Sequence, residues 1–274
     1  MPEDKVEQLI EDQEVEIPIE APVEIPIESP VGIPEEVVIE ETKSADLDSW
    51  EPKTDLGRKV KSGEITNIDY ILDNGIRIME VEIVDRLLPN LESDLILIGQ
   101  SKGKFGGGKR SIWRQTQKKT KEGNKPKFSA LVVVGNKDGY VGIGLGKAKE
   151  TVPAREKAMR NSKLNIIKIK RGSGSWESEA AEPNSIPCKV EGKMGSSRIV
   201  LMSAPKGTGL RLEKECAKML QLAGISDVYS KTFGQTKTKI NLINACFNAL
   251  KKLSKIRMRE EFIKKSGLVS GHAK

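Results

Sequence analysis

The sequence predicts an α+β protein made of two successive folded parts, and three observations support this prediction. Residues 128–134 and 141–146 carry apolar side chains in a pattern with a period of two, which is typical of strands. Apolar residues recur at helical spacing in 150–164 and 210–223. Residues 173–187, SGSWESEAAEPNSIP, are rich in glycine, serine and proline, so we interpret them as the linker between the two parts.

The N-terminal segment differs in composition from the rest of the chain. Residues 1–51 hold seventeen acidic and two basic residues, a net charge of −15. Proline recurs there at every fourth position, at Pro18, Pro22, Pro26, Pro30 and Pro34. Because proline interrupts a helix and so acidic a segment cannot build a core, we expect residues 1–48 to be a disordered acidic tail. Two roles remain open: screening of the basic body until an anionic partner displaces it, or a dispensable solvated appendage.

The remainder of the chain is strongly basic. Residues 52–274 hold 44 basic and 22 acidic residues, a net charge of +22. This predicts attraction to a polyanion, with a merely soluble basic protein as the alternative. No apolar run is long enough to span a bilayer and no signal-peptide pattern begins the chain, so we expect a soluble intracellular protein. Cys188, Cys216 and Cys246 lack metal-ligand spacing, and the last two fit helix cores.

Residues 49–94 predict a helical segment. Apolar residues recur at helical spacing in three short groups, which Gly63 and Gly75 separate. Thr66 is expected to cap the second helix, and Pro89 to end the third. We expect these helices to serve packing, because no catalytic pattern is visible in them.

The first domain is predicted to span residues 95–172. A strand at 95–98 precedes a basic loop at 99–127, and the sequence Asn-Lys-Asp-Gly at 136–139 favours a hairpin between the next two strands. A helix at 150–164 follows, with Val152, Ala158 and Met159 available to the sheet. Three strands followed by a helix with basic residues is the layout of a double-stranded-RNA-binding domain.

Three glycines interrupt the last of these strands. Gly142, Gly144 and Gly146 alternate with Val141, Ile143 and Leu145, so one face of the strand has no side chains. Glycine weakens a strand, which indicates that something approaches this backbone closely. A packed helix and a nucleic acid are both open as that neighbour.

The second domain is predicted to span residues 188–256. It is expected to contain strands at 188–191 and 198–202, a Gly-Thr-Gly-Leu turn, a helix at 210–223, a strand at 228–230 and a helix at 239–253. The basic residues after this domain, 257–274, are expected to form a mobile tail.

Enzyme signatures are incomplete. Gly103, Gly108 and Lys109 have the spacing of a P-loop, but Arg110 stands where that loop needs a hydroxyl for magnesium. The sequence PKGTGL at 205–210 resembles the phosphate loop of galactokinase-like enzymes but lacks the serines that follow there. The single histidine, His272, lies near the end of the chain. We therefore expect no catalysis, no cofactor and no metal site.

The basic loop at 99–127 is the main candidate site, because it holds ten basic residues and one acid, Glu122. Such a loop suits RNA phosphates, and Phe105 and Trp113 suit either base stacking or anchoring of the loop to the sheet. The basic residues are Lys102, Lys104, Lys109, Arg110, Arg114, Lys118, Lys119, Lys121, Lys125 and Lys127.

Several longer stretches resemble a known family. KFSALVVVGNKDGYVGIGLGKAKE, PCKVEGKMGSSRIVLMSAPKGTGL and LAGISDVYSKTFG closely resemble the universal small-subunit ribosomal protein number five, over about residues 52–256. TDLGRKVKSGEITNIDYIL and KRGSGSW resemble its archaeal branch. The acidic tail departs from the family, and the Gly106–Gly108 run makes the loop longer. Some archaeal relatives carry cysteines and a histidine where this linker has none, so no metal site is implied.

The resemblance implies a structural, RNA-binding role in the cytoplasmic ribosome. It implies a double-stranded-RNA-binding-like domain followed by a left-handed β-α-β domain, with contacts to ribosomal proteins four and eight and to messenger RNA where it enters the subunit. Alternatives are a free double-stranded-RNA-binding regulator and a degenerate kinase-like protein. RNA-binding residues expected outside the loop are Lys147, Lys149, Arg155, Arg160, Lys163, Lys193 and Arg198.

Overall fold

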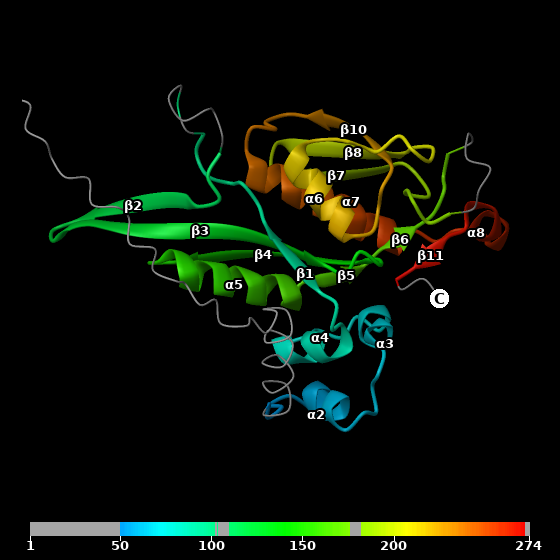
Figure 1. Ribbon diagram of the computed structural model, residues 1–274, viewed down its shortest axis with the longest axis horizontal. Helices are drawn as coiled ribbons and strands as arrows, with labels where there is room; N and C mark the ends of the chain where they lie inside the picture. Colours follow the sequence, from blue (N-terminus) through cyan, green and yellow to red (C-terminus); the bar gives the residue numbers. More distant parts are fainter. Residues whose placement is uncertain (1–49, 102, 104–109, 176–181, 272–274) are drawn as a thin grey trace, which may run out of the picture. The chain divides into compact units, whose positions relative to one another are not determined.

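A computed structural model describes residues 50–101, 103, 110–175 and 182–271 (Figure 1). By their contacts, the described residues belong to one compact unit. The expected acidic tail, residues 1–48, lies outside the described residues.

The three predicted N-terminal helices are confirmed as α2 (Asp55–Lys61), α3 (Ile68–Asp73) and α4 (Val81–Leu87). Thr54 begins α2, since its side chain accepts a hydrogen bond from the amide of Gly57. The prediction that Thr66 caps α3 is wrong. That helix begins one residue later, after an extended Asn67, because Ile68 must turn into the core, where it is 4% exposed.

The first sheet is antiparallel throughout, in the order β1-β3-β4-β5, with β2 pairing β3 beyond the end of β1. Its strands are β1 (Glu92–Leu95), β2 (Arg114–Thr120), β3 (Gly123–Gly135), β4 (Tyr140–Ala148) and β5 (Ile166–Lys168). The prediction of a strand at 95–98 is wrong by three residues. The strand ends at Leu95, although the amide of Ile96 still donates to Leu131 O of β3 at 3.0 Å; Ile96 and Ile98 are apolar because both are buried. Strand β5 was not predicted from the sequence.

The β3–β4 turn has the predicted chemistry. Asn136 accepts hydrogen bonds through its side-chain oxygen from the amides of Asp138 and Tyr140, at 2.9 and 3.2 Å. Gly139 has φ +95°, a conformation that favours glycine. The hairpin prediction is confirmed.

Helix α5 (Thr151–Leu164) lies against the glycine face of β4. A Cβ placed on Gly142, Gly144 or Gly146 would lie 2.1–2.2 Å from a carbonyl oxygen of α5, so the helix is the close neighbour. Of the two alternatives, the packed helix is therefore the observed one. The prediction that Val152 faces the sheet is wrong, because Val152 is 64% exposed and Ala154 is buried instead.

The second sheet has the order β7-β8-β10-β9, and α6 and α7 lie on the side that faces β3 and β4 (Figure 1). Its elements are β7 (Val190–Met194), β8 (Ser197–Ser203), β9 (Leu210–Arg211), α6 (Lys214–Leu222), β10 (Val228–Phe233) and α7 (Lys239–Lys255). The helix predicted from residue 210 begins at Lys214, because Leu210 and Arg211 pair in parallel with β10.

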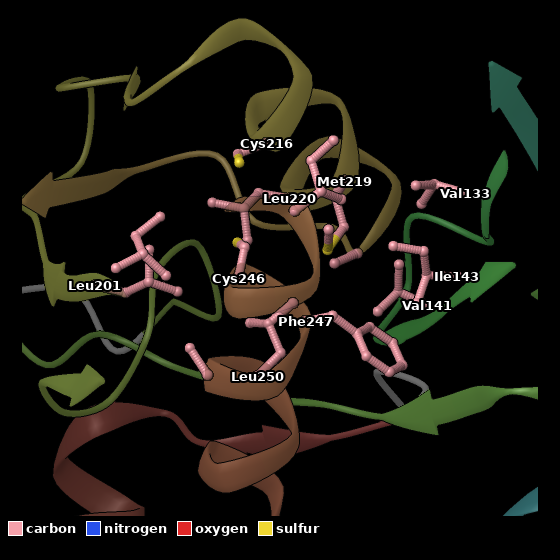
Figure 2. Packing of buried hydrophobic residues seen from close by; sticks show 14 of the residues in the cluster. Val133, Val141, Ile143, Leu201, Cys216, Met219, Leu220, Cys246, Phe247 and Leu250 are labelled. Carbon is pink, nitrogen blue, oxygen red and sulfur yellow. The ribbon is translucent and has the colours of Figure 1, made fainter. Parts of the chain in front are cut away.

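One hydrophobic core joins the two parts of the chain. Val133, Val141 and Ile143 of the first sheet point toward Met219 of α6 and Phe247 of α7 (Figure 2). The thiols of Cys216 and Cys246 lie in the same cluster and are fully buried, which confirms that they are core residues. The second part is thus packed on the first, and the linker is not their sole connection.

The C-terminal segment adds elements that the sequence analysis missed. Residues after α7 form α8 (Glu260–Ser266) and β11 (Val269–Ser270), and β11 pairs with β6 (Lys170–Arg171). The amide of Ser173 donates to Ser266 O at 2.8 Å, and that of Gly271 to Ile169 O at 3.1 Å. The described part of the expected mobile tail is therefore docked on the body, while His272 lies outside the described residues.

Candidate nucleic-acid interface

The predicted basic loop is in large part a regular hairpin. Strands β2 and β3 pair from Arg114 opposite Ser129 to Thr120 opposite Gly123, and they turn at Lys121 and Glu122. Gly123 has φ +114°, which permits this tight turn. Half of the candidate segment is thus held by backbone hydrogen bonds rather than being an irregular loop.

The register of the hairpin sorts its basic residues between two faces. Residues directly opposite in an antiparallel pair lie on the same face, and every second residue along a strand shares that face. Five basic residues lie on one face, which we call the basic face, and β3 continues this face into the core through Leu131 and Val133. The five are Arg114, Lys118, Lys125, Lys127 and Lys147. Lys119 lies on the opposite face, on the side of α5.

The hairpin keeps most of this charge unpaired within the described part of the chain. Its strands are exposed to solvent from Arg114 to Lys127, apart from a half-buried Thr120. Lys125 pairs with Glu122 at 2.8 Å, and both side chains are more than half exposed, so solvent screens this pair. The basic face is therefore a solvated strip of positive charge, suited to phosphates.

The residues that precede the hairpin are described only in part. Arg110 is half-buried and forms a β-bridge with Ser101. Trp113 packs against the apolar cluster to which α3 and α4 contribute residues. Of its two possible roles, the structure therefore shows that Trp113 anchors the loop to the body. The remaining candidates of this stretch lie outside the described residues: Lys102, Lys104, Phe105 and Lys109.

Helix α5 places its candidates on the other side of the first sheet. Arg155 and Arg160 are exposed, and Lys149 is exposed just before the helix. Lys163 differs from them, because its amine pairs with Asp85 of α4 at 2.7 Å and its side chain is 19% exposed. Lys163 thus fastens α4 to α5, which leaves it little freedom to meet RNA.

The last two candidates lie on the second sheet. Lys193 and Arg198 are directly opposite each other on β7 and β8, and Arg198 also pairs with Glu191 at 3.1 Å. Helices α6 and α7 lie between this sheet and the first one, so the candidates form three separate groups. Three further exposed residues, which were not predicted as candidates, lie on the neighbouring β10: Tyr229, Lys231 and Phe233. Their period of two in the sequence VYSKTF was the available signal.

The phosphate-loop resemblance at 205–210 fails on its backbone. The amide of Gly209 donates to the carboxylate of Asp227 at 2.7 Å, and that of Thr208 to Pro205 O at 3.3 Å. Asp227 is itself buried, and the side chain of Asn184 donates to it at 3.0 Å. Two amides that a phosphate cradle needs are therefore already engaged.

The thiols also lack catalytic character. A hydrogen bond with Cys246, together with burial, raises the pKa of the Cys216 thiol. Burial likewise raises the pKa of the Cys188 thiol, against a smaller opposite effect of Lys170. Raised pKa values disfavour the thiolate, which is the nucleophilic form. The described residues contain no group of three potential metal ligands and no helix able to span a membrane.

Comparisons with known proteins agree with this non-enzymatic arrangement. Residues 112–170 match the profile of ribosomal protein S5, N-terminal domain, and residues 192–264 match that of ribosomal protein S5, C-terminal domain. The small ribosomal subunit protein uS5 of Nanoarchaeum equitans is 52% identical over 225 residues, which cover 82% of this chain and 96% of that protein. The chain belongs to the ribosomal protein S5 family.

Other members of the S5 family match over the same extent. The uS5 proteins of Methanocaldococcus jannaschii and Methanobrevibacter smithii are 48% and 44% identical over 225 residues, covering 82% of this chain and 97% and 99% of theirs. The predicted resemblance to the archaeal branch is thereby confirmed. These relatives are ribosomal proteins rather than enzymes, so this S5 chain is a ribosomal protein of the small subunit.

Proposed function

We propose that the chain is a structural constituent of the small ribosomal subunit that holds ribosomal RNA with the basic face of hairpin β2–β3. The observation that carries the proposal is the register of this hairpin, which aligns Lys118 with Lys125 and places Lys127 on the same exposed face. Phosphate contacts of this kind position a protein on RNA, and their number sets the salt dependence of binding.

The remaining candidate residues extend this proposal. Arg155 and Arg160 are exposed on α5, where a double-stranded-RNA-binding-like domain presents basic residues to a duplex. Lys102, Lys104 and Lys109 would lengthen the basic strip beyond the hairpin, and Lys193 and Arg198 would add a contact from the second sheet. For the second part, we propose the left-handed β-α-β connection of the family, with β9, α6 and β10 as its elements.

Position in the subunit is a further part of the proposal. The resemblance to the family suggests that the chain lies where messenger RNA enters, beside ribosomal proteins four and eight, and that it contributes to translational accuracy. Support comes from the charge of the hairpin and from the absence of an enzymatic arrangement among the described residues.

The deciding experiment is sedimentation of a cell extract that contains the full-length chain. We expect the chain to sediment with the small subunit at moderate salt. Replacing Lys118, Lys119 and Lys121 with glutamate should reduce this association or raise the error rate of translation. Glu122→Gln is a matched control, since it lies in the same turn and removes a negative charge. A chain that stays at the top of the gradient, with no subunit-bound fraction, would show a free RNA-binding protein instead.

A further inference from the structure

The outer face of the second sheet carries side chains to which the hairpin proposal gives no role. Strand pairing places Lys193 and Phe233 on either side of Arg198, and Tyr229 next to Arg211. Lys231 lies on β10 between the two aromatic residues. We call this side of the sheet the outer face, and the residues used below are Lys193, Arg198, Arg211, Tyr229, Lys231 and Phe233. The register places Glu191, Val200 and Met202 on the same side.

The packing of the sheet explains why this face is open. Its inner face meets α7 so closely that a Cβ on Gly192 would lie 1.9 Å from Ala245 O. On the same inner face, Val228 is fully buried, whereas the next residue, Tyr229, points to the outer side and is 41% exposed. Phe233, four residues further along the same strand and on the same face, is 51% exposed. Figure 1 shows α6 and α7 on the inner side of β7, β8 and β10.

The charge of the outer face is positive. Four of its residues are basic, and Glu191 is the acidic neighbour, paired with Arg198 at 3.1 Å. Among the described residues, no carboxylate forms an ion pair with Lys193, Lys231 or Arg211. A polyanion that reached this face would find Arg211 beside Tyr229 and Lys231 between the two rings, both without an ion pair among the described residues.

The arrangement favours RNA over a protein partner. The centre of a protein interface is depleted of charged residues. Here each exposed ring has a basic side chain directly beside it in the sheet. Unpaired bases stack on aromatic rings while their phosphates meet lysine and arginine, and RNA-binding sheets use this combination. Four residues of strand separate the two rings by about 13 Å, so each would receive its own base.

We propose that the outer face of the second sheet is a second RNA-binding surface, which stacks unpaired bases on Tyr229 and Phe233. This rests on the proposed function in one respect, namely that the partner of the chain is RNA. It differs in the form of RNA, because the basic face of β2–β3 suits a duplex backbone whereas exposed rings need bases that are free to stack.

The test uses the purified full-length chain and two RNA probes, a single strand of about ten uridines and a duplex of about 20 base pairs. The variants are Tyr229→Ala, Phe233→Ala and the conservative Phe233→Tyr. Tyr70→Ala is the matched control, since the ring of Tyr70 is also exposed, at 58%, and lies on α3. Circular dichroism and thermal unfolding should show that all four variants fold, because each altered ring is at the surface.

We expect each alanine variant to weaken binding of the single strand about five-fold or more, as the loss of one stacked base predicts. The salt dependence should not change, because no phosphate contact is removed. Phe233→Tyr should retain most of the affinity of the unaltered chain, and duplex binding should stay unchanged in all variants.

Unchanged single-strand affinity in both alanine variants would overturn this proposal while leaving the hairpin proposal standing. A normal RNA affinity combined with loss from reconstituted subunits would indicate a protein contact and would also overturn it. If the unaltered chain bound neither the single strand nor the duplex, both proposals would be refuted.

Discussion

The guanidinium of Arg171 lies 2.6 Å from the carboxylate of Asp138, at the point where three distant segments meet. The side chain of Arg171 is only 6% exposed, and that of Asp138 25%. Arg171 also donates to the carbonyl oxygens of Gly224 and Gly271, both at 3.3 Å. The pair therefore ties the β3–β4 turn to the end of α6 and to the strand β11.

Replacing Arg171 with methionine should destabilise the protein by about 3 kcal/mol, because it removes the guanidinium that Asp138 and several carbonyl groups share in a largely buried site. The measurement is the urea midpoint of unfolding. Arg58→Met is the control, since the Arg58–Asp55 pair is exposed and should contribute nothing measurable. Equal losses in the two variants would mean that the buried network is not what holds these segments.

A methyl group on Gly144 should separate α5 from the first sheet. Its Cβ would lie 2.2 Å from both Ala158 O and Ser162 N, which are backbone atoms that cannot rotate away. Gly144→Ala should therefore cost about 1–3 kcal/mol in the free energy of unfolding, as overpacking does. Gly103→Ala provides the comparison, because no atom of the described residues lies within 4 Å of its Cβ position. A native urea midpoint for Gly144→Ala would show that α5 moves aside at no cost.

The elements that the sequence predicted correctly are those with local signals. Helices α5 and α7 have apolar residues at helical spacing, and the β3–β4 turn has Asn136 and Gly139 at its ends. The short strands that it missed depend on distant partners. Strands β9 and β11 have two residues each, and they exist because β10 and β6 pair with them. No pattern inside two residues can report such a pairing.

The candidate site shows the same division. The basic composition of residues 99–127 was visible in the sequence, but the face on which each lysine lies was not. Polar residues occupy both faces of β2, so the hairpin has no apolar period that would reveal its register. The alignment of Lys118 with Lys125 follows from the pairing of Thr120 with Gly123 at the turn. Neighbours on a strand always lie on opposite faces, and the register decides that Lys118, rather than Lys119, shares a face with Lys125.

Acid should release the N-terminal helices through Glu80. Its carboxylate accepts hydrogen bonds from the amides of Lys53 and Thr54, at 3.0 and 2.6 Å. Burial alone would raise the pKa of Glu80, but hydrogen bonds from the side chain of Thr54, from these two amides and from Trp50 outweigh it and hold the pKa below its ordinary value of 4.5. A lowered pKa in the folded state means that the carboxylate stabilises the fold above pH 4.5 and that this contribution is lost as the pH falls through the folded-state pKa.

The corresponding variant is Glu80→Gln. At neutral pH it should expose the amides of α2 to faster hydrogen exchange than in the native chain, and the difference should vanish at a pH below the folded-state pKa of Glu80. Glu51→Gln, at an exposed position nearby, should behave like the native chain throughout. A difference between Glu80→Gln and the native chain that persists in acid would point to lost packing rather than lost charge.

The two faces of the hairpin can be compared with one pair of neighbouring residues. Lys118 and Lys119 are adjacent and exposed, but Lys118 lies on the basic face with Lys125, whereas Lys119 lies on the side of α5. If the basic face holds the RNA backbone, Lys118→Ala should reduce the salt slope of duplex binding by about 0.9, the value of one phosphate contact. Lys119→Ala should reduce the salt slope of duplex binding by clearly less. The measurement is duplex affinity between about 50 and about 200 mM salt, over which one contact changes binding about three-fold. Equal slopes for the two variants would mean that RNA meets both faces of the hairpin, and an unchanged slope for Lys118→Ala would remove the basic face from the interface.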